Sequence, residues 1–216
     1  MSESDNDELQ LHPDTLAALN EFYKEREESE KQFERALENN DCTQESLDIQ
    51  ENWQLSQFWY DENTIKAITD AALKCTDDNS NIALISCPSL YKALKKKSDG
   101  RQVKLFEFDQ RFSVFGTDFI FYDYNTPQNI PADLHGIFDL VICDPPFLSE
   151  ECLSKTAITV RLLMKKKVVL CTGAIMEELS SKLLAVKKCT FTPHHKNNLA
   201  NEFSCYSNFN FDNCIN

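Results

Sequence analysis

The sequence predicts an α/β fold built on a doubly wound parallel sheet. Short apolar runs alternate with stretches of helical character, and this alternation is typical of strands joined by crossover helices. The runs are also almost continuously apolar, as expected for strands that are buried on both faces. The predicted strands cover residues 82–87, 103–108, 118–122, 138–143 and 167–172, and the predicted helices cover residues 89–97, 149–164 and 174–184.

Both ends of the folded part extend this pattern. Before the first strand, Asp61 can cap a helix that runs to about Lys74, with apolar residues on one face at positions 65, 68, 72 and 73. After the last helix, residues 189–193 and 202–209 resemble two strands joined by the polar stretch HHKNNLAN. Two strands in direct succession predict an antiparallel hairpin at the edge of the sheet.

Length and charge predict one folded domain behind an acidic arm. A chain of 216 residues that is 42% apolar can bury one sizeable core but hardly two. Residues 1–50 hold 15 acidic and 4 basic residues, a net charge of −11, so only −2 of the total of −13 belongs to the rest. We therefore expect residues 1–45 to be a largely flexible acidic arm and residues 46–216 to be the folded domain.

The sequence also predicts a soluble cytoplasmic protein. No segment approaches the roughly 20 consecutive apolar residues of a membrane span, and the N-terminus MSESDNDELQ lacks the pattern of a secretion signal. The nine cysteines are odd in number and scattered singly, so we expect reduced thiols. No CxxC pair occurs, and we expect no metal site.

The predicted sheet places two loops at one crevice. Ligands of doubly wound sheets bind beyond the carboxyl ends of the strands, where the strand order reverses. The first strand ends in Ser86-Cys87-Pro88-Ser89, and a later strand ends at Asp144. If these strands flank the reversal, the two loops face each other, with Ser86 and Pro88 as candidate ligand contacts.

The loop Asp144-Pro145-Pro146-Phe147 has the chemistry of an amine-binding site. Two prolines fix the backbone and remove two donors, which leaves a stiff array of acceptors. The Asp144 carboxylate and the Pro145 carbonyl can hold two N–H groups of an amine and direct its lone pair. Phe147 adds a flat wall that could stack on a base or pack along the methylenes of a lysine. A proline-rich turn with a structural aspartate is the alternative.

Acidic residues at two further strand ends predict a pocket for an adenosine. Glu107 and Asp109 lie near the end of the second strand, where a carboxylate can accept both hydroxyls of a ribose. Glu107 fits this position slightly better, because Asp109 could instead cap the next helix. Asp123 ends the third strand and could accept the exocyclic amine of adenine beside Tyr124, although a turn-capping role is the alternative.

Several collinear blocks resemble a known family, the eukaryotic elongation factor 1-alpha lysine methyltransferases, once described as N6-adenine DNA methyltransferases. The blocks are ENWQLSQFWY, LFEFDQRF, FIFYDYN, DLVICDPPFLSEECL, LCTGAIMEE and NLANEFSCY, and they cover almost the whole chain after the arm. The resemblance implies a seven-stranded Rossmann-like sheet of the class I methyltransferase type, S-adenosylmethionine as cofactor, and a lysine substrate on the elongation factor. It also implies that the aromatic block closes over the cofactor, with Gln57 and Tyr60 as candidate cofactor contacts; packing of the block in the core is the alternative.

Two features depart from the family pattern. The glycine-rich loop that usually follows the first strand is absent, since the sequence there is ISCPSLY. Cofactor approach would then depend on small side chains such as Ser86. The last aromatic of the motif is Phe147 rather than the commoner tyrosine, so stacking is kept while a phenolic hydrogen bond is lost.

The leading hypothesis is a protein-lysine methyltransferase that acts as a monomer on a basic protein. An N6-adenine methyltransferase on DNA or RNA is the alternative, because the same acceptors fit an exocyclic amine. Duplex DNA would require base flipping and a basic recognition surface, for which the chain has neither spare length nor positive charge. A silent subunit that keeps the fold only for binding is a third hypothesis.

Overall fold

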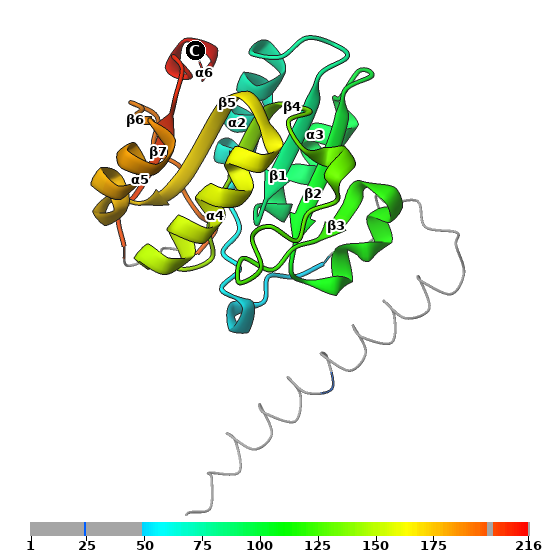
Figure 1. Ribbon diagram of the computed structural model, residues 1–216, viewed down its shortest axis with the longest axis horizontal. Helices are drawn as coiled ribbons and strands as arrows, with labels where there is room; N and C mark the ends of the chain where they lie inside the picture. Colours follow the sequence, from blue (N-terminus) through cyan, green and yellow to red (C-terminus); the bar gives the residue numbers. More distant parts are fainter. Residues whose placement is uncertain (1–23, 25–48, 198–200, 216) are drawn as a thin grey trace, which may run out of the picture. The chain divides into compact units, whose positions relative to one another are not determined.

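A computed structural model describes residue 24 and residues 49–197 and 201–215, and among them seven strands form one sheet (Figure 1). The predicted arm at residues 1–45 lies outside the described residues, apart from Lys24. The strands are β1 (Asn81–Ile85), β2 (Gln102–Glu107), β3 (Phe119–Phe121), β4 (Phe138–Cys143), β5 (Met164–Gly173), β6 (Lys187–Lys188) and β7 (Phe203–Ser207). The predicted α/β sheet is confirmed.

The strand order places the reversal between β1 and β4, which meets the condition set in the sequence analysis. The order is β3-β2-β1-β4-β5-β7-β6, so β1 continues to β2 on one side and to β4 on the other. Both pairings are parallel, and Ile85 stands opposite Cys143 at the carboxyl end. The two loops that follow these strands therefore leave the same edge of the sheet side by side.

Helices cover both faces of the sheet (Figure 1). The α-helices are α2 (Glu62–Lys74), α3 (Tyr91–Lys96), α4 (Glu150–Leu163), α5 (Glu177–Leu184) and α6 (Asp212–Ile215), and short 3-10 helices are η1 (Trp53–Leu55), η2 (Pro88–Leu90), η3 (Gln110–Asp118), η4 (Ala132–Leu134) and η5 (Ala174–Met176). Asp61 caps α2 as predicted, because its side chain accepts the backbone N–H of Thr64. Within the described residues, none of these helices has the length and apolar character that crossing a bilayer requires.

Alternate residues of each strand feed two apolar layers. Ile82 and Leu84 of β1 pack with α2 and α3, whereas Ala83 and Ile85 pack on the opposite face with α4. All four side chains are fully buried. Because successive strand residues point to opposite faces, this burial on both sides explains the continuous apolar runs in the sequence.

The predicted hairpin at the edge is real, but its first strand lies elsewhere. β6 covers residues 187–188 and pairs antiparallel with β7, whereas the prediction placed it at residues 189–193. Beyond Cys189, the backbone N–H groups of Thr190 and Phe191 bond to the Asp212 carboxylate of α6 instead of to a strand. β7 itself lies inside the edge, between β5 and β6.

Candidate active site

A cavity of about 560 Å³ opens at the carboxyl edge of the sheet, around the point where the strand order reverses. It is bounded by the loops after β1, β2, β3 and β4 and by the segment that precedes α2. The lining residues are Gln54, Leu55, Ser56, Gln57, Phe58, Trp59, Ser86, Cys87, Pro88, Ser89, Glu107, Phe108, Tyr122, Asp123, Tyr124, Asn125, Asp144, Pro145, Pro146, Phe147, Leu148, His195, Asn201 and Phe203. Most of the predicted site residues therefore share one cavity.

The loop from Asp144 to Phe147 is anchored on both sides. The backbone N–H of Asp144 donates to the carbonyl of Ile85 at 3.0 Å, which extends the β1–β4 pairing by one bond. Ser149 then caps α4 through the N–H of Cys152. Phe147 is 43% exposed, and its ring meets Tyr124 edge to face with centroids 5.7 Å apart. The loop thus offers an aromatic surface to the cavity from a fixed backbone.

Gly173, at the end of β5, makes room for this loop. A Cβ at position 173 would lie 2.9 Å from Leu148 Cδ2, closer than real Cβ contacts come. Leu148 follows Phe147 and lines the cavity. Any side chain at position 173 must therefore displace the end of the Leu148 side chain.

We expect Gly173→Ala to lower the free energy of unfolding by about 1 kcal/mol, the low end of the cost of overpacking, because the end of the Leu148 side chain can move aside. Catalytic turnover should change little, because the backbone of the Asp144 loop can stay in place. Denaturant unfolding and initial rates measure the two effects. In the double variant with Leu148→Ala, the two losses of stability should be less than additive; strictly additive losses would show that the two side chains do not meet.

Asp144 is a half-buried carboxylate whose charged form is disfavoured by its surroundings. Desolvation raises its pKa to about 7 from an ordinary value of 3.8; the hydrogen bond from Tyr60 opposes that rise, and the negative charge of Glu107 adds to it. Perturbed carboxylates of this kind in a cavity are typical of catalytic sites.

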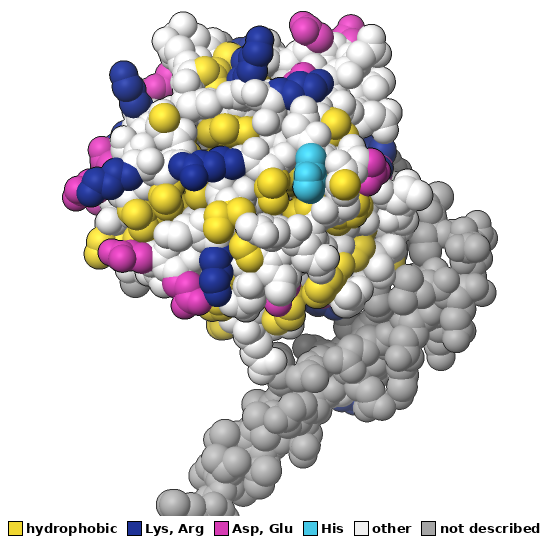
Figure 2. All heavy atoms as spheres, in the orientation of Figure 1, with side chains coloured by type: hydrophobic (Ala, Val, Ile, Leu, Met, Phe, Trp, Pro, Cys, Tyr) yellow, Lys and Arg dark blue, Asp and Glu magenta, His cyan; other side chains and the backbone are white. Residues whose placement is uncertain are grey.

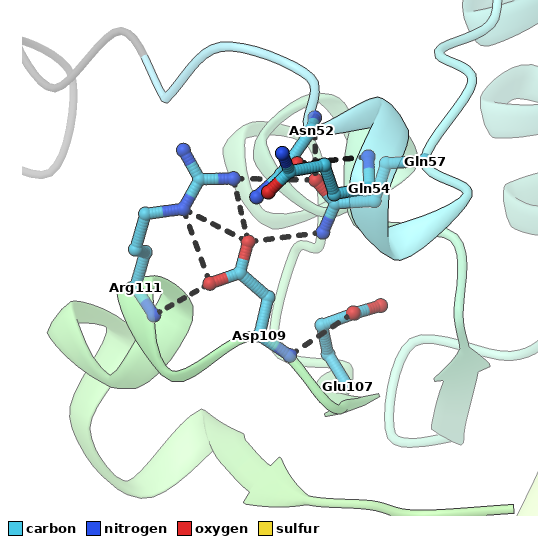
Figure 3. Close-up of polar contacts among 6 residues, drawn as sticks. All are labelled: Asn52, Gln54, Gln57, Glu107, Asp109 and Arg111. Atoms are coloured by element: carbon cyan, nitrogen blue, oxygen red, sulfur yellow. Dashed lines mark hydrogen bonds and ion pairs between the residues drawn. The ribbon is translucent and has the colours of Figure 1, made fainter. Parts of the chain in front are cut away.

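The structure separates the roles of Glu107 and Asp109, between which the sequence left the choice open (Figure 3). Glu107 is 5% exposed and lines the cavity, and burial raises its pKa to about 7. Asp109 caps η3 and forms an ion pair with Arg111 at 2.6 Å, outside the cavity wall. Although burial opposes it, contact with Arg111 keeps the pKa of Asp109 below its ordinary value. Of the two acids, Glu107 is thus the one that lines the cavity.

Gln57 connects the segment before α2 to this acidic end of the cavity (Figure 3). Its Nε2 donates to Asp109 Oδ2 at 3.0 Å, and its Oε1 accepts from Arg111 Nη2 at 3.2 Å. The same Oε1 accepts the backbone N–H of Asn52 at 2.9 Å. Gln57 also lines the cavity, so this network fixes the wall that residues 54–59 provide.

Asp123 caps a turn and also lines the cavity. Its Oδ1 accepts the backbone N–H of Asn125 at 2.8 Å, which is the turn-capping role. It lines the cavity beside Tyr122 and Tyr124, so the turn does not exclude it from the cavity wall.

The glycine-poor loop after β1 adopts a conformation that glycine usually provides. Ser86 has φ 54°, in the left-handed region, and its N–H donates to the carbonyl of Phe106 at 2.9 Å. Ser86 and Pro88 both line the cavity, and Pro88 begins η2. Whether small side chains there replace bare backbone toward a cofactor stays a prediction.

Tyr60 lies in a different place from the one that the resemblance suggested. It is 1% exposed and is not a lining residue, and its hydroxyl donates to Asp144 Oδ2 at 2.6 Å. The aromatic block therefore contacts an acidic side chain at each of two strand ends. Gln57 bonds to Asp109 after β2, and the Tyr60 hydroxyl bonds to Asp144 after β4.

Sequence reasoning missed Trp59, His195 and Phe203 as parts of the cavity wall. His195 contacts Phe203 with ring centroids 4.7 Å apart, and burial lowers its pKa. The density of aromatics at residues 53–60 was a usable signal for Trp59. Nothing in the local sequence indicates that His195 returns to the cavity, because a backbone bridge to Tyr60 brings it there.

The sheet order, the cavity at the reversal and the acceptor loop after β4 define a class I methyltransferase. A solved structure with a similar fold is described as an RNA methyltransferase of Pyrococcus horikoshii. It aligns with a TM-score of 0.51 at 14% identity, over 73% of this chain and 88% of its own. At that identity the likeness concerns the fold alone.

Sequence comparison then gives the family. The model described as "Probable N6-adenine methyltransferase" matches residues 51–211. A Mus musculus protein named EEF1A lysine methyltransferase 1 is 46% identical over 97% of this chain and 96% of its own length. Its Gallus gallus namesake is 48% identical over 97% and 98%. The chain belongs to this family, that of the EEF1A lysine methyltransferases.

Proposed function

We propose that this protein is an S-adenosylmethionine-dependent protein-lysine N-methyltransferase whose substrate is translation elongation factor 1-alpha. The observation that carries the proposal is the charge of the cavity. Its described lining residues include three carboxylic acids, Glu107, Asp123 and Asp144, and neither a lysine nor an arginine. Such a site favours cationic groups, as a sulfonium and a lysine ammonium are, and disfavours phosphates. The relatives named for lysine methylation support the same substrate class.

The residues present fit the proposed cofactor. Buried Glu107 suits the two hydroxyls of a ribose, and Asp123 suits an adenine amine. Trp59 also lines the cavity and adds an aromatic side chain to its wall. When bound, the cofactor supplies an activated methyl group.

The chain's own part in the reaction is to receive and orient the amine. A lysine is protonated near pH 7, with a pKa of about 10.4, and an ammonium has no lone pair. The apolar wall at Phe147 disfavours the charged form, whereas ionised Asp144 favours it. Asp144, with a pKa raised to about 7, is too weak a base to take the proton outright. We therefore assign Asp144 and the Pro145 carbonyl to orienting the N–H groups, and most of the rate to alignment.

An adenine substrate has one argument in its favour, the description of the matching family model. One face of the described surface gives it no support. On the face with α4 and α5, lysines and arginines stand apart with acidic side chains among them (Figure 2). Nucleic-acid-binding surfaces instead gather basic residues into a patch or stripe.

Label transfer tests the proposal directly. Purified protein and methyl-labelled S-adenosylmethionine are incubated with extract from cells lacking the protein, with and without nuclease. We expect one labelled protein band of the elongation factor, unchanged by nuclease, with the label on a lysine by mass spectrometry. Label that disappears after nuclease treatment would instead support the adenine alternative.

We further propose that the chain acts as a cytoplasmic monomer and that its acidic arm speeds the encounter with a basic substrate. The arm carries −11 of the net −13. Long-range attraction weakens as salt shortens the Debye length from about 10 Å at 0.1 M to about 3 Å at 1 M.

Deleting residues 1–45 should raise the Michaelis constant for the protein substrate at low salt and leave the maximal rate and cofactor affinity nearly intact. The full-length and truncated enzymes should converge at high salt. Steady-state kinetics over a salt series measures this. Identical kinetics at every salt concentration would reduce the arm to a solubilising tail, and loss of cofactor binding would show that it belongs to the fold.

A further inference from the structure

Tyr60 makes a partly buried contact with Asp144. Its hydroxyl lies 2.6 Å from Asp144 Oδ2, and the two residues are 84 positions apart in the chain. Among the described residues, no other donor bonds to the Asp144 carboxylate. Burial and the negative charge of Asp144 raise the pKa of Tyr60 well above its ordinary value. The hydroxyl therefore keeps its proton and acts as the donor.

The phenol is held by its backbone and by a neighbouring ring. Tyr60 forms an antiparallel bridge with His195, and its ring lies 5.1 Å from that imidazole. On either side, Lys196 N donates to the Trp59 carbonyl at 2.8 Å and Asp61 N donates to the His194 carbonyl at 2.9 Å. Asp61 also caps α2. These backbone contacts hold Tyr60 in place, and its hydroxyl therefore has a fixed position relative to Asp144.

The other titratable groups around Asp144 do not share this effect. Glu107, from the end of β2, interacts unfavourably with ionised Asp144. The thiols of Cys87 and Cys143 are fully buried and remain protonated, because burial raises both of their pKa values well above the ordinary range. His195 contacts the Tyr60 ring, and burial lowers its pKa. Tyr60 is therefore the group that favours an ionised Asp144.

We infer that Tyr60 is a positioning residue: by donating to Oδ2 it favours the ionised form of Asp144 and leaves Oδ1 for the substrate amine. This inference rests on the proposed function, since it assumes that ionised Asp144 receives an amine. It also changes the role of the aromatic block at residues 57–60. Tyr60 positions Asp144 from behind the cavity wall, and Gln57 holds the opposite end of the cavity, where the cofactor is proposed to bind.

The test is the pH dependence of turnover in Tyr60→Phe, with cofactor saturating at each pH so that the titration of Glu107 does not contribute. Activity falls as Asp144 is protonated, and removing the donor favours protonation. A hydrogen bond to a charged group corresponds to about one to two pH units. We expect the acidic limb to move upward by that amount, with a loss of about 10- to 100-fold below the limb and near-normal activity above it.

Tyr91→Phe is the matched control. Tyr91 is another buried tyrosine whose hydroxyl donates to a carboxylate, that of Asp118 at 2.8 Å, away from the cavity. It should lose stability and leave the pH profile in place. If Tyr60→Phe moves the limb no further than Tyr91→Phe does, Tyr60 has a packing role only and the inference is overturned.

A second variant keeps the hydroxyl and the shape. Replacing Tyr60 alone by 3-fluorotyrosine makes the phenol a stronger donor, so the limb should move to lower pH, opposite to Tyr60→Phe. An unmoved limb would contradict the inference even if Tyr60→Phe failed to fold. Wild-type protein is assayed in parallel on the elongation factor. Absence of transfer by the wild type would count against the proposed function itself, whereas wild-type transfer with unmoved limbs would count only against the role of Tyr60.

Discussion

Asp144→Ala should abolish methyl transfer while cofactor affinity stays within a few fold of the wild-type value. The expected loss of turnover is at least about 10²-fold, because misplacing a reacting group by even 1 Å has an effect of that size. Asp144 lies at the acceptor loop, and its contacts are to Tyr60 and to the cavity rather than to a structural cation. Single-turnover kinetics and calorimetric titration with cofactor separate the two quantities.

Asp139→Ala is the control for this variant. Asp139 stands near the start of the same strand, β4, and binds the N–H of Asn81 and the ammonium of Lys165. Its loss should affect stability and leave transfer largely unchanged. Near-normal turnover in Asp144→Ala would refute the proposed role of the acid.

Glu107→Ala should weaken cofactor binding by about 1.5–3 kcal/mol, the scale of hydrogen bonds to a charged group. The carboxylate lines the cavity and is buried, so few water molecules can replace its contacts. Calorimetry measures the change in affinity. Asp109→Ala is the informative comparison, because Asp109 acts on Gln57 and Arg111 outside the wall and should weaken binding less.

The pH dependence of binding gives a second measure of Glu107. Its pKa is raised to about 7 by burial, so in the free protein it is protonated below neutral pH. Ribose hydroxyls donate to the ionised form, and binding should therefore weaken as pH falls through 7, by up to tenfold per unit. Glu107→Gln should lose this dependence. A loss confined to Asp109→Ala would transfer the ribose role to Asp109.

Much of the fold could be predicted because its determinants are local. The strand β4 is recognisable from its own apolar run. The start of α2 is recognisable from Asp61, which caps the helix through a residue three positions away. The position of β6 could not be predicted in this way. Its end is decided by Asp212, which takes the next backbone donors from 22 and 21 residues away.

For the site, the sequence by itself determined which chemistry reaches the carboxyl edge: an acceptor loop after β4 and acids after β2 and β3. It could not decide between Glu107 and Asp109, because residues two apart in extended backbone point the same way. Only the tertiary structure made that choice, since Gln57 and Arg111 engage Asp109 and leave Glu107 to the cavity. The pairing of Tyr60 with Asp144 likewise required the fold. Contacts across 84 residues depend on how helices and strands pack, and no local pattern encodes them.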